Sequence, residues 1–87
     1  MYIIISYDVD VSRVNRINKY LKRFLYWRLN SVFEGEVSNS QLEEIKDGIE
    51  KIINKSTDSV LIYILPSKKS VFTEVIGIEK EPIDFIL

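Results

Sequence analysis

The chain contains 87 residues, 46% of them hydrophobic, which suits one compact domain with a single core. It has no cysteine and no histidine, so disulfides, Cys/His zinc sites, thiolate nucleophiles and imidazole bases are all excluded. The formal net charge of −1 conceals a segregation, because residues 11–33 carry six basic side chains without an acid, whereas residues 34–50 carry six acids against one lysine.

A strand and a helix are predicted at the start of the chain. Residues 2–7, YIIISY, form a nearly continuous β-branched and aromatic run, which is typical of a central strand covered on at least one face. From Ser12 onward the hydrophobic residues recur at helical spacing, which predicts a helix over 12–25 with its basic residues on the outer face. Two carboxylates, Asp8 and Asp10, stand between the two predicted elements.

Strand chemistry returns after this helix. Residues 28–37 read RLNSVFEGEV, which predicts either one bent strand or two short ones, with Gly35 permitting a bulge or bend. The next segment, SNSQLEE over 38–44, contains two overlapping matches to a capping box. Hydrophobic residues then recur at helical spacing, so a second helix is predicted over 40–54.

The last third of the chain contains three hydrophobic stretches. Strands are predicted over 59–65 and 72–78, separated by the turn composition PSKKS, and over the tail 83–87. This element order predicts helices packed on one face of a mainly antiparallel sheet, a two-layer α+β architecture of ferredoxin-like type. We therefore expect one ferredoxin-like domain over 1–87, with residues 80–87 as an extra C-terminal strand that pairs with another copy in a homodimer.

The sequence carries no pattern typical of a membrane or secreted protein. No hydrophobic run approaches the about 20 residues needed to cross a bilayer. Met1 leads directly into a strand pattern without a basic leader region. These features predict a cytoplasmic protein.

Three segments carry a distinctive combination of motifs. They read SYDVDVSRVNRINKYLKRF, NSVFEGEVSNSQLEEI and TDSVLIYIL, and they span most of the chain. As a set they resemble the CRISPR-associated protein 2 family, although each segment alone would be a weak match. The resemblance implies a homodimer of ferredoxin-like protomers that cleaves RNA or double-stranded DNA with a metal ion. It also implies a scaffold role between integrase dimers during CRISPR spacer acquisition.

Asp8 matches the metal-associated aspartate of that family, which the resemblance places near the two-fold axis of the dimer. Without histidine, hydrolysis in this chain would depend on carboxylates and a hard cation. Mg²⁺, or another divalent cation such as Mn²⁺, is often held by one or two carboxylates together with waters and a substrate phosphate. Two Asp8 side chains across a two-fold axis would supply such a site. The alternative from the residues alone is that Asp8 bonds to backbone amides in the turn before the helix.

Four further residues belong to this candidate site. Asp10 is a weaker metal-ligand candidate, because an acid just before a helix also suits a cap. Tyr7 is expected to face away from Asp8 across the pleat and to pack as an aromatic, unless the strand has already ended. Phe33 fits the core or a dimer interface, and Ser31 fits either contact with the site or exposure to solvent.

Basic residues on the first predicted helix form a candidate nucleic-acid surface. Arg13 and Arg16 lie three positions apart, a spacing suited to straddling phosphates, and Lys19 and Arg23 extend the same stripe. The resemblance implies contact with the backbone of duplex DNA, which carries little sequence information and weakens as salt rises. The alternative is an ordinary solvated helix face.

Three functions fit these observations to different degrees. The first is a spacer-acquisition dimer that also acts as a Mg²⁺-dependent endonuclease on single-stranded RNA or double-stranded DNA. The second is a catalytically idle scaffold of the same family that binds duplex DNA and the CRISPR integrase. The third, an RNA-recognition module, requires aromatic residues on central strands, and segment 59–65 offers only Tyr63.

Overall fold

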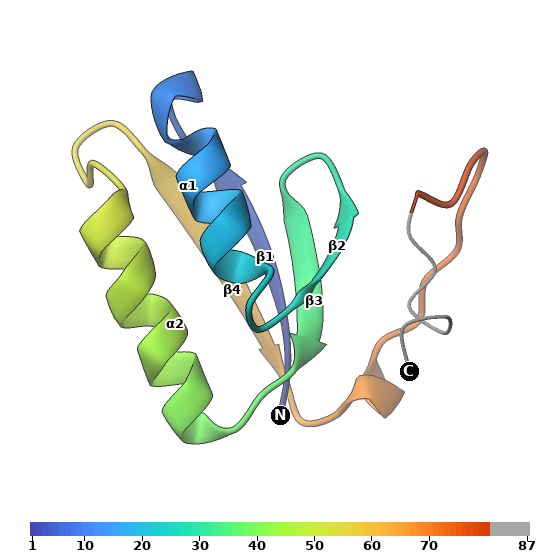
Figure 1. Cartoon of the computed structure of the whole chain (residues 1–87). Coiled ribbons are helices and arrows are strands. Elements are labelled where there is room, and N and C mark those ends of the chain that lie inside the picture. The colour runs from blue at the N-terminus through green and yellow to red at the C-terminus, as the bar shows by residue number, and fades with distance from the viewer. Residues whose placement is uncertain (81–87) are drawn as a thin grey trace.

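The computed structural model describes residues 1–80 of the chain. Its elements, in chain order, are β1 (Tyr2–Asp8), α1 (Val11–Leu21), β2 (Tyr26–Leu29), β3 (Val32–Glu36), α2 (Asn39–Ile52), β4 (Ser59–Leu65) and the short 3₁₀ helix η1 (Lys68–Ser70). The strands form one antiparallel sheet in the order β2-β3-β1-β4, and both helices pack on one face of it (Figure 1). This arrangement is the ferredoxin-like α+β fold predicted from the element order. No helix among these residues is long and apolar enough to cross a membrane.

β1 is a central strand, as its hydrophobic run predicts. It pairs with β3 on one side and with β4 on the other, so that Ile5 stands opposite both Phe33 and Ile62. Alternate side chains of β1, namely Ile3, Ile5 and Tyr7, face the helices and are buried. The other half of its side chains therefore belongs to the sheet face that the helices leave uncovered, which we call the open face.

The core lies between the sheet and the two helices. Phe33 from β3, Ile17 and Leu21 from α1, and Ile45 from α2 are completely buried. Burial of one such side chain contributes about 1.5–3 kcal/mol relative to its exposure. The helical spacing of hydrophobic residues therefore identified the helix faces that contact the sheet.

Two helix boundaries follow from local hydrogen bonds. At the start of α2, Ser38 Oγ accepts from the backbone N of Gln41 at 3.1 Å, and Gln41 Oε1 accepts from the backbone N of Ser38 at 2.9 Å. The predicted capping box is therefore present at Ser38. α1 ends at Leu21 rather than at Leu25, because the backbone N atoms of Arg23 and Phe24 donate three residues back, to the carbonyls of Tyr20 at 3.2 Å and Leu21 at 3.0 Å, instead of four residues back as in an α-helix.

Residues 28–37 belong to two short strands, one of the two alternatives predicted for this segment. β2 ends at Leu29 and β3 begins at Val32. Between them, Asn30 has a φ of 44°, in the left-handed region that asparagine adopts more readily than most residues. The chain turns back at this residue, and the two strands pair as a hairpin.

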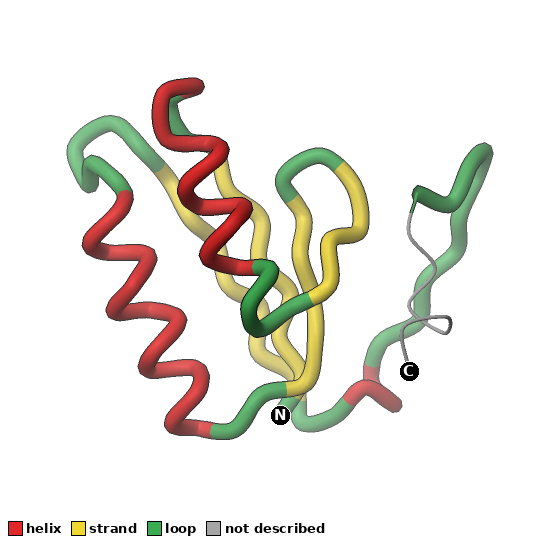
Figure 2. Tube along the Cα trace, viewed as in Figure 1, coloured by secondary structure: helices red, strands yellow, loops and turns green. Residues whose placement is uncertain are grey.

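The prediction of a strand over 72–78 is wrong, because the structure has no strand there. Residues 71–80 contain no strand and lie beyond β2, away from the helices (Figure 2). Phe72, Ile76 and Ile78 are 92%, 100% and 80% exposed. The hydrophobic pattern of this segment suits a strand, but a strand also needs a neighbouring strand to receive its hydrogen bonds.

Apart from its first residue, the tail strand expected over 80–87 lies outside the described residues. The segment before it is joined to the sheet by a polar network. Arg28 of β2 lies between Glu34 of β3, at 3.9 Å, and Glu79, at 3.2 Å. Glu34 is buried and accepts a hydrogen bond from the hydroxyl of Tyr2 at 2.8 Å. The network therefore links the start of β1, the β2–β3 hairpin and the C-terminal segment.

Candidate functional site

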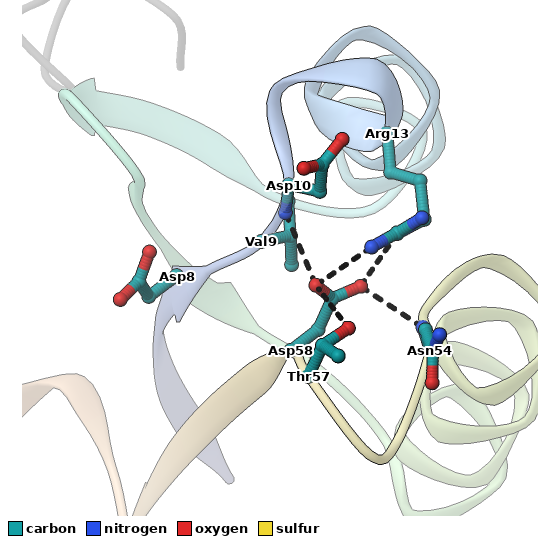
Figure 3. Close-up of a pocket in the computed structure, with 7 residues that line it drawn as sticks. All are labelled: Asp8, Val9, Asp10, Arg13, Asn54, Thr57 and Asp58. Carbon is teal, nitrogen blue, oxygen red and sulfur yellow. Dashed lines mark hydrogen bonds and ion pairs between the residues drawn. The ribbon is translucent and has the colours of Figure 1, made fainter.

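Asp8 is the last residue of β1, and its side chain is exposed. It stands opposite Ser59 of β4 in the antiparallel register. Because strand side chains alternate, it belongs to the open face together with Ile4 and Ser6, whereas Tyr7 faces the helices. Its carboxylate points away from the other labelled residues in Figure 3. The Asp8 carboxylate is therefore accessible to a ligand that approaches the open face.

Asp10 is engaged by the start of α1. Its Oδ2 accepts hydrogen bonds from the backbone N of Ser12, at 2.9 Å, and from the hydroxyl of Ser12. These hydrogen bonds make Asp10 the N-cap of α1 and lower the pKa of its carboxyl. The capping interpretation is confirmed, and metal ligation by Asp10 stays a prediction.

Asp58, in the loop just before β4, is a site residue that the sequence analysis missed. Its side chain is 1% exposed. Arg13 of α1 donates from Nε to Asp58 Oδ2 at 2.6 Å and from Nη2 to Oδ1 at 2.9 Å. The backbone N of Asp10 donates to Oδ1 at 3.1 Å, and that of Asn54 donates to Oδ2 at 2.9 Å (Figure 3). One carboxylate thereby joins the β1–α1 turn, helix α1 and the α2–β4 loop.

The charge of Asp58 is stabilised by these donors. A bidentate pair between arginine and a carboxylate is stronger and more specific in geometry than a single hydrogen bond. The hydrogen bonds from Arg13, followed by those from the backbone of Asn54 and Asp10, hold the pKa of Asp58 well below its usual range. The same pairing raises the pKa of Arg13. Asp58 is therefore ionised at neutral and mildly acidic pH.

The sequence contains little that would have identified Asp58. It follows N-K-S-T in a polar turn, where aspartate is common for local reasons. Its main partner lies 45 positions earlier, and no spacing rule connects residues that far apart. The available signal was topological, because an antiparallel first and last strand bring the start of the first helix close to the loop before the last strand.

An open pocket lies at this end of the sheet. It is lined by Asp8, Val9, Asp10, Arg13, Asn54, Thr57 and Asp58. Asp10 and Asp58 are engaged in the helix cap and the ion pair, and within residues 1–80 no three acidic side chains form a group able to hold a metal ion. At this pocket one chain thus offers a cation the Asp8 carboxylate and Asp10 Oδ1, which accepts neither of the helix-cap hydrogen bonds. These donors fit Mg²⁺ or Mn²⁺ only as part of a larger set of oxygen ligands, because these ions prefer octahedral coordination.

The three predicted supporting residues lie in β1, in β3 and in the β2–β3 turn. Tyr7 is buried, its ring stacks on that of Phe33 with centroids 6.4 Å apart, and its hydroxyl donates to Oδ1 of Asn18. Phe33 is completely buried, so it belongs to the core. Ser31 lies in the hairpin turn, where its carbonyl accepts from the backbone N of Tyr7 at 3.3 Å. These residues support β1 beneath Asp8.

The basic residues predicted to bind nucleic acid have different surroundings: Arg13, Arg16, Lys19 and Arg23. The guanidinium of Arg13 is held in the ion pair described above, with 24% of its side chain exposed. That of Arg23 lies 5.5 Å from the ring centroid of Tyr20 and 5.4 Å from that of Phe24, which is cation–π geometry. Arg16 and Lys19 are exposed on α1, and Arg23 is exposed in the turn after it. Arg13 is therefore the one member of the set that is not exposed.

The chain is similar to known proteins along its whole length. A sequence model of the family described as CRISPR associated protein Cas2 matches residues 1–76. The CRISPR-associated endoribonuclease Cas2 of Methanocaldococcus jannaschii is 53% identical over 87 residues, covering 100% of this chain and 76% of that protein. The protein of the same name from Pyrococcus furiosus is 51% identical over 87 residues, covering 100% of both chains.

The similarity extends to three dimensions. A chain described as the crystal structure of cas2 superimposes on this one with a TM-score of 0.86 at 51% sequence identity. The superposition covers 94% of this chain and 92% of the other. Because the family model spans most of the chain and the fold agrees, the chain belongs to the CRISPR-associated protein Cas2 family.

Proposed function

We propose that this protein is a metal-dependent endonuclease that hydrolyses phosphodiester bonds in single-stranded RNA or double-stranded DNA. Asp8 is the residue that would hold the cation. The relatives named above are called CRISPR-associated endoribonucleases, so RNA is the first substrate to test. The observation that carries the proposal is the exposed carboxylate of Asp8 at the end of β1, beside two aspartates that are already engaged.

The proposed active form is a homodimer. One Asp8 supplies too few oxygen ligands for Mg²⁺ or Mn²⁺, and a second copy related by a two-fold axis would bring a second Asp8. Hydrophobic side chains on the open face support this proposal, since Leu61 and Tyr63 of β4 are each 53% exposed. The tail over 80–87 would add a strand to the second copy.

The chain's own contribution would be to position the reacting groups. A divalent cation bound at Asp8 would polarise the phosphodiester and lower the pKa of a coordinated water. Asp8 would hold it at a firm strand end, because β1 is bonded to a strand on each side. Arg16 and Lys19 would bind the phosphate backbone and align the substrate.

A second candidate function is a scaffold that joins duplex DNA to the CRISPR integrase during spacer acquisition, with Asp8 catalytically idle. The exposed Arg16 and Lys19 favour this function, because basic side chains on a helix surface contact the backbone without reading sequence. Under either function we propose that the protein acts in the cytoplasm on nucleic acid.

The test compares the native protein with Asp8→Ala and Asp47→Ala on end-labelled single-stranded RNA and double-stranded DNA. Asp47 is an exposed acid of α2, away from the pocket, so Asp47→Ala removes one negative charge, as Asp8→Ala does, without changing the candidate site. We expect cleavage that requires Mg²⁺ or Mn²⁺, stops when a chelator is added, disappears in Asp8→Ala and persists in Asp47→Ala. Dimer content is matched by sedimentation.

Cleavage that continues unchanged in Asp8→Ala would remove Asp8 from the reaction. Absence of cleavage in the native protein, together with salt-sensitive binding of duplex DNA, would support the scaffold function instead.

A further inference from the structure

We propose that Asp58 is a positioning residue for Asp8: it sets the direction of the chain at the end of β1 and thereby the place of the Asp8 carboxylate. This inference rests on the proposed nuclease function. It is carried by the contacts of a carboxylate that is 1% exposed and that comes from a distant part of the chain.

Asp58 holds the residues that directly follow Asp8. The backbone N of Asp10 donates to Asp58 Oδ1 at 3.1 Å. Arg13, in the first turn of α1, donates two more hydrogen bonds to the same carboxylate, at 2.6 and 2.9 Å. The segment after Asp8 is therefore attached to Asp58 through both its backbone and a side chain.

Asp58 is itself fixed from the opposite side. The backbone N of Asn54 donates to Asp58 Oδ2 at 2.9 Å, and the backbone N of Asp58 donates to the carbonyl of Asn54 at 2.7 Å. The next residue, Ser59, stands opposite Asp8 in the sheet register. Asp58 therefore restrains Asp8 from two sides: through Ser59 on the neighbouring strand, and through the turn that follows Asp8. Functional groups need such support to stay within about 0.5 Å of a productive position.

The ion pair also separates Arg13 from Asp8. The guanidinium of Arg13 lies against Asp58, while the carboxylate of Asp8 points to the other side (Figure 3). An arginine paired with Asp8 would compete with a cation for its oxygens. By engaging Arg13, Asp58 keeps the Asp8 carboxylate accessible on the open face.

The first test measures kcat, the KM for RNA and the Mg²⁺ concentration at half-maximal rate. It compares the native protein, Asp58→Asn and the control Asp47→Asn, at a temperature where circular dichroism shows all three to be folded. Asp58→Asn keeps the size of the side chain and one acceptor oxygen but loses the charge that holds Arg13. We expect kcat to fall about 10-fold or more, with a higher Mg²⁺ requirement and nearly unchanged KM.

A purely structural role would lower the melting temperature of Asp58→Asn and leave kcat, KM and the Mg²⁺ requirement of the folded protein unchanged. That result would overturn the proposal.

The second test is independent of catalysis. Amide hydrogen exchange, followed by NMR, is compared in the native protein, Asp58→Ala and Asp47→Ala. We expect Asp58→Ala to accelerate exchange at residues 8–10 far more than in β3. Uniform acceleration over the whole sheet, or no change at residues 8–10, would overturn the proposal. If the native protein cleaves neither RNA nor DNA, the nuclease function fails, and the exchange result still decides whether Asp58 positions Asp8.

Discussion

Arg13 and Asp58, which lie 45 positions apart in the sequence, form a bidentate ion pair with N–O distances of 2.6 and 2.9 Å. The pair joins the start of α1 to the start of β4, which the sheet brings together by placing β1 beside β4. An arginine predicted to bind nucleic acid therefore also stabilises the fold. Its substitution should affect folding as well as binding.

Asp58 should make the protein sensitive to acid. Its pKa is lowered in the folded state, mainly by the hydrogen bonds from Arg13, whereas an aspartate in an unfolded chain titrates near about 3.9. The unfolded state therefore binds more protons, so the contribution of Asp58 is complete above about pH 4 and is lost as pH falls toward the folded pKa. Denaturant unfolding between about pH 7 and about pH 3 should show a steeper loss of stability for the native protein than for Asp58→Asn. Parallel curves would contradict this prediction.

Tyr2 should produce the opposite dependence at high pH. Burial, followed by the hydrogen bond to Glu34, raises the pKa of Tyr2 above the usual tyrosine range. In the unfolded chain it would ionise near about 10, so its contribution is fully present below that pH and is lost as pH rises toward the folded value. The native protein should lose stability above about pH 10 more steeply than Tyr2→Phe, which cannot ionise. Ultraviolet titration of tyrosinate is the second measurement. Burial also raises the pKa of Tyr7 and of Tyr20, so the test is the size of the late-titrating fraction, and a fraction as large in Tyr2→Phe as in the native protein would refute the assignment.

Gly48 of α2 makes room for Tyr20 of α1. A Cβ at Gly48 would overlap the ring of Tyr20, whose hydroxyl donates to the carbonyl of Glu44 at 2.6 Å. Gly48→Ala gains about 1 kcal/mol of helix propensity, but overpacking costs about 1–3 kcal/mol. We therefore expect the free energy of unfolding to fall by up to about 2 kcal/mol, as measured by urea denaturation.

The control for Gly48 is the same substitution in a Tyr20→Ala background. There the overlap is gone, and Gly48→Ala should stabilise the protein by about 1 kcal/mol. Equal effects in the two backgrounds would show that the Tyr20 ring does not set the requirement for glycine.

Arg16 and Arg13 should differ in their effects on binding of duplex DNA. If the exposed Arg16 contacts one phosphate, Arg16→Gln should reduce the slope of log Kobs against log salt by about 0.9 and leave the melting temperature unchanged. Arg13→Gln should lower the melting temperature, because it removes the cation paired with Asp58. Fluorescence anisotropy at several salt concentrations and thermal melts measure the two effects. Lys46→Gln, an exposed position of α2, is the charge-matched control, and a salt slope in Arg16→Gln equal to that of the native protein would exclude Arg16 from the interface.

Secondary structure could be predicted where the hydrophobic pattern reports local burial. The runs over 2–7 and 59–65 and the helical spacing in α1 and α2 correspond to elements in the structure, with boundaries off by a few residues. The segment over 72–78 has an equally good strand composition, yet it forms no strand in the described chain. Composition describes one segment, whereas strand formation requires a second segment at bonding distance.

The same distinction between local patterns and long-range contacts applies to the candidate site. The strand-end position of Asp8 and the cap at Asp10 could be predicted because each depends on neighbouring residues. Asp58 could not, because its donors Asp10 and Arg13 lie at the start of α1, which only the folded chain brings beside the α2–β4 loop. The same holds for Arg13, which was predicted on the outer face of the helix but is paired with Asp58, with only 24% of its side chain exposed.

β4 forms one edge of the described sheet and carries the nearly continuous hydrophobic sequence VLIYIL. An uncovered edge strand of this composition is a template on which further chains add strands and aggregate. Ordered assembly would therefore protect the protein as well as complete its site. A variant that assembles less well should consequently precipitate or form fibres during expression, before any defect in cleavage can be measured.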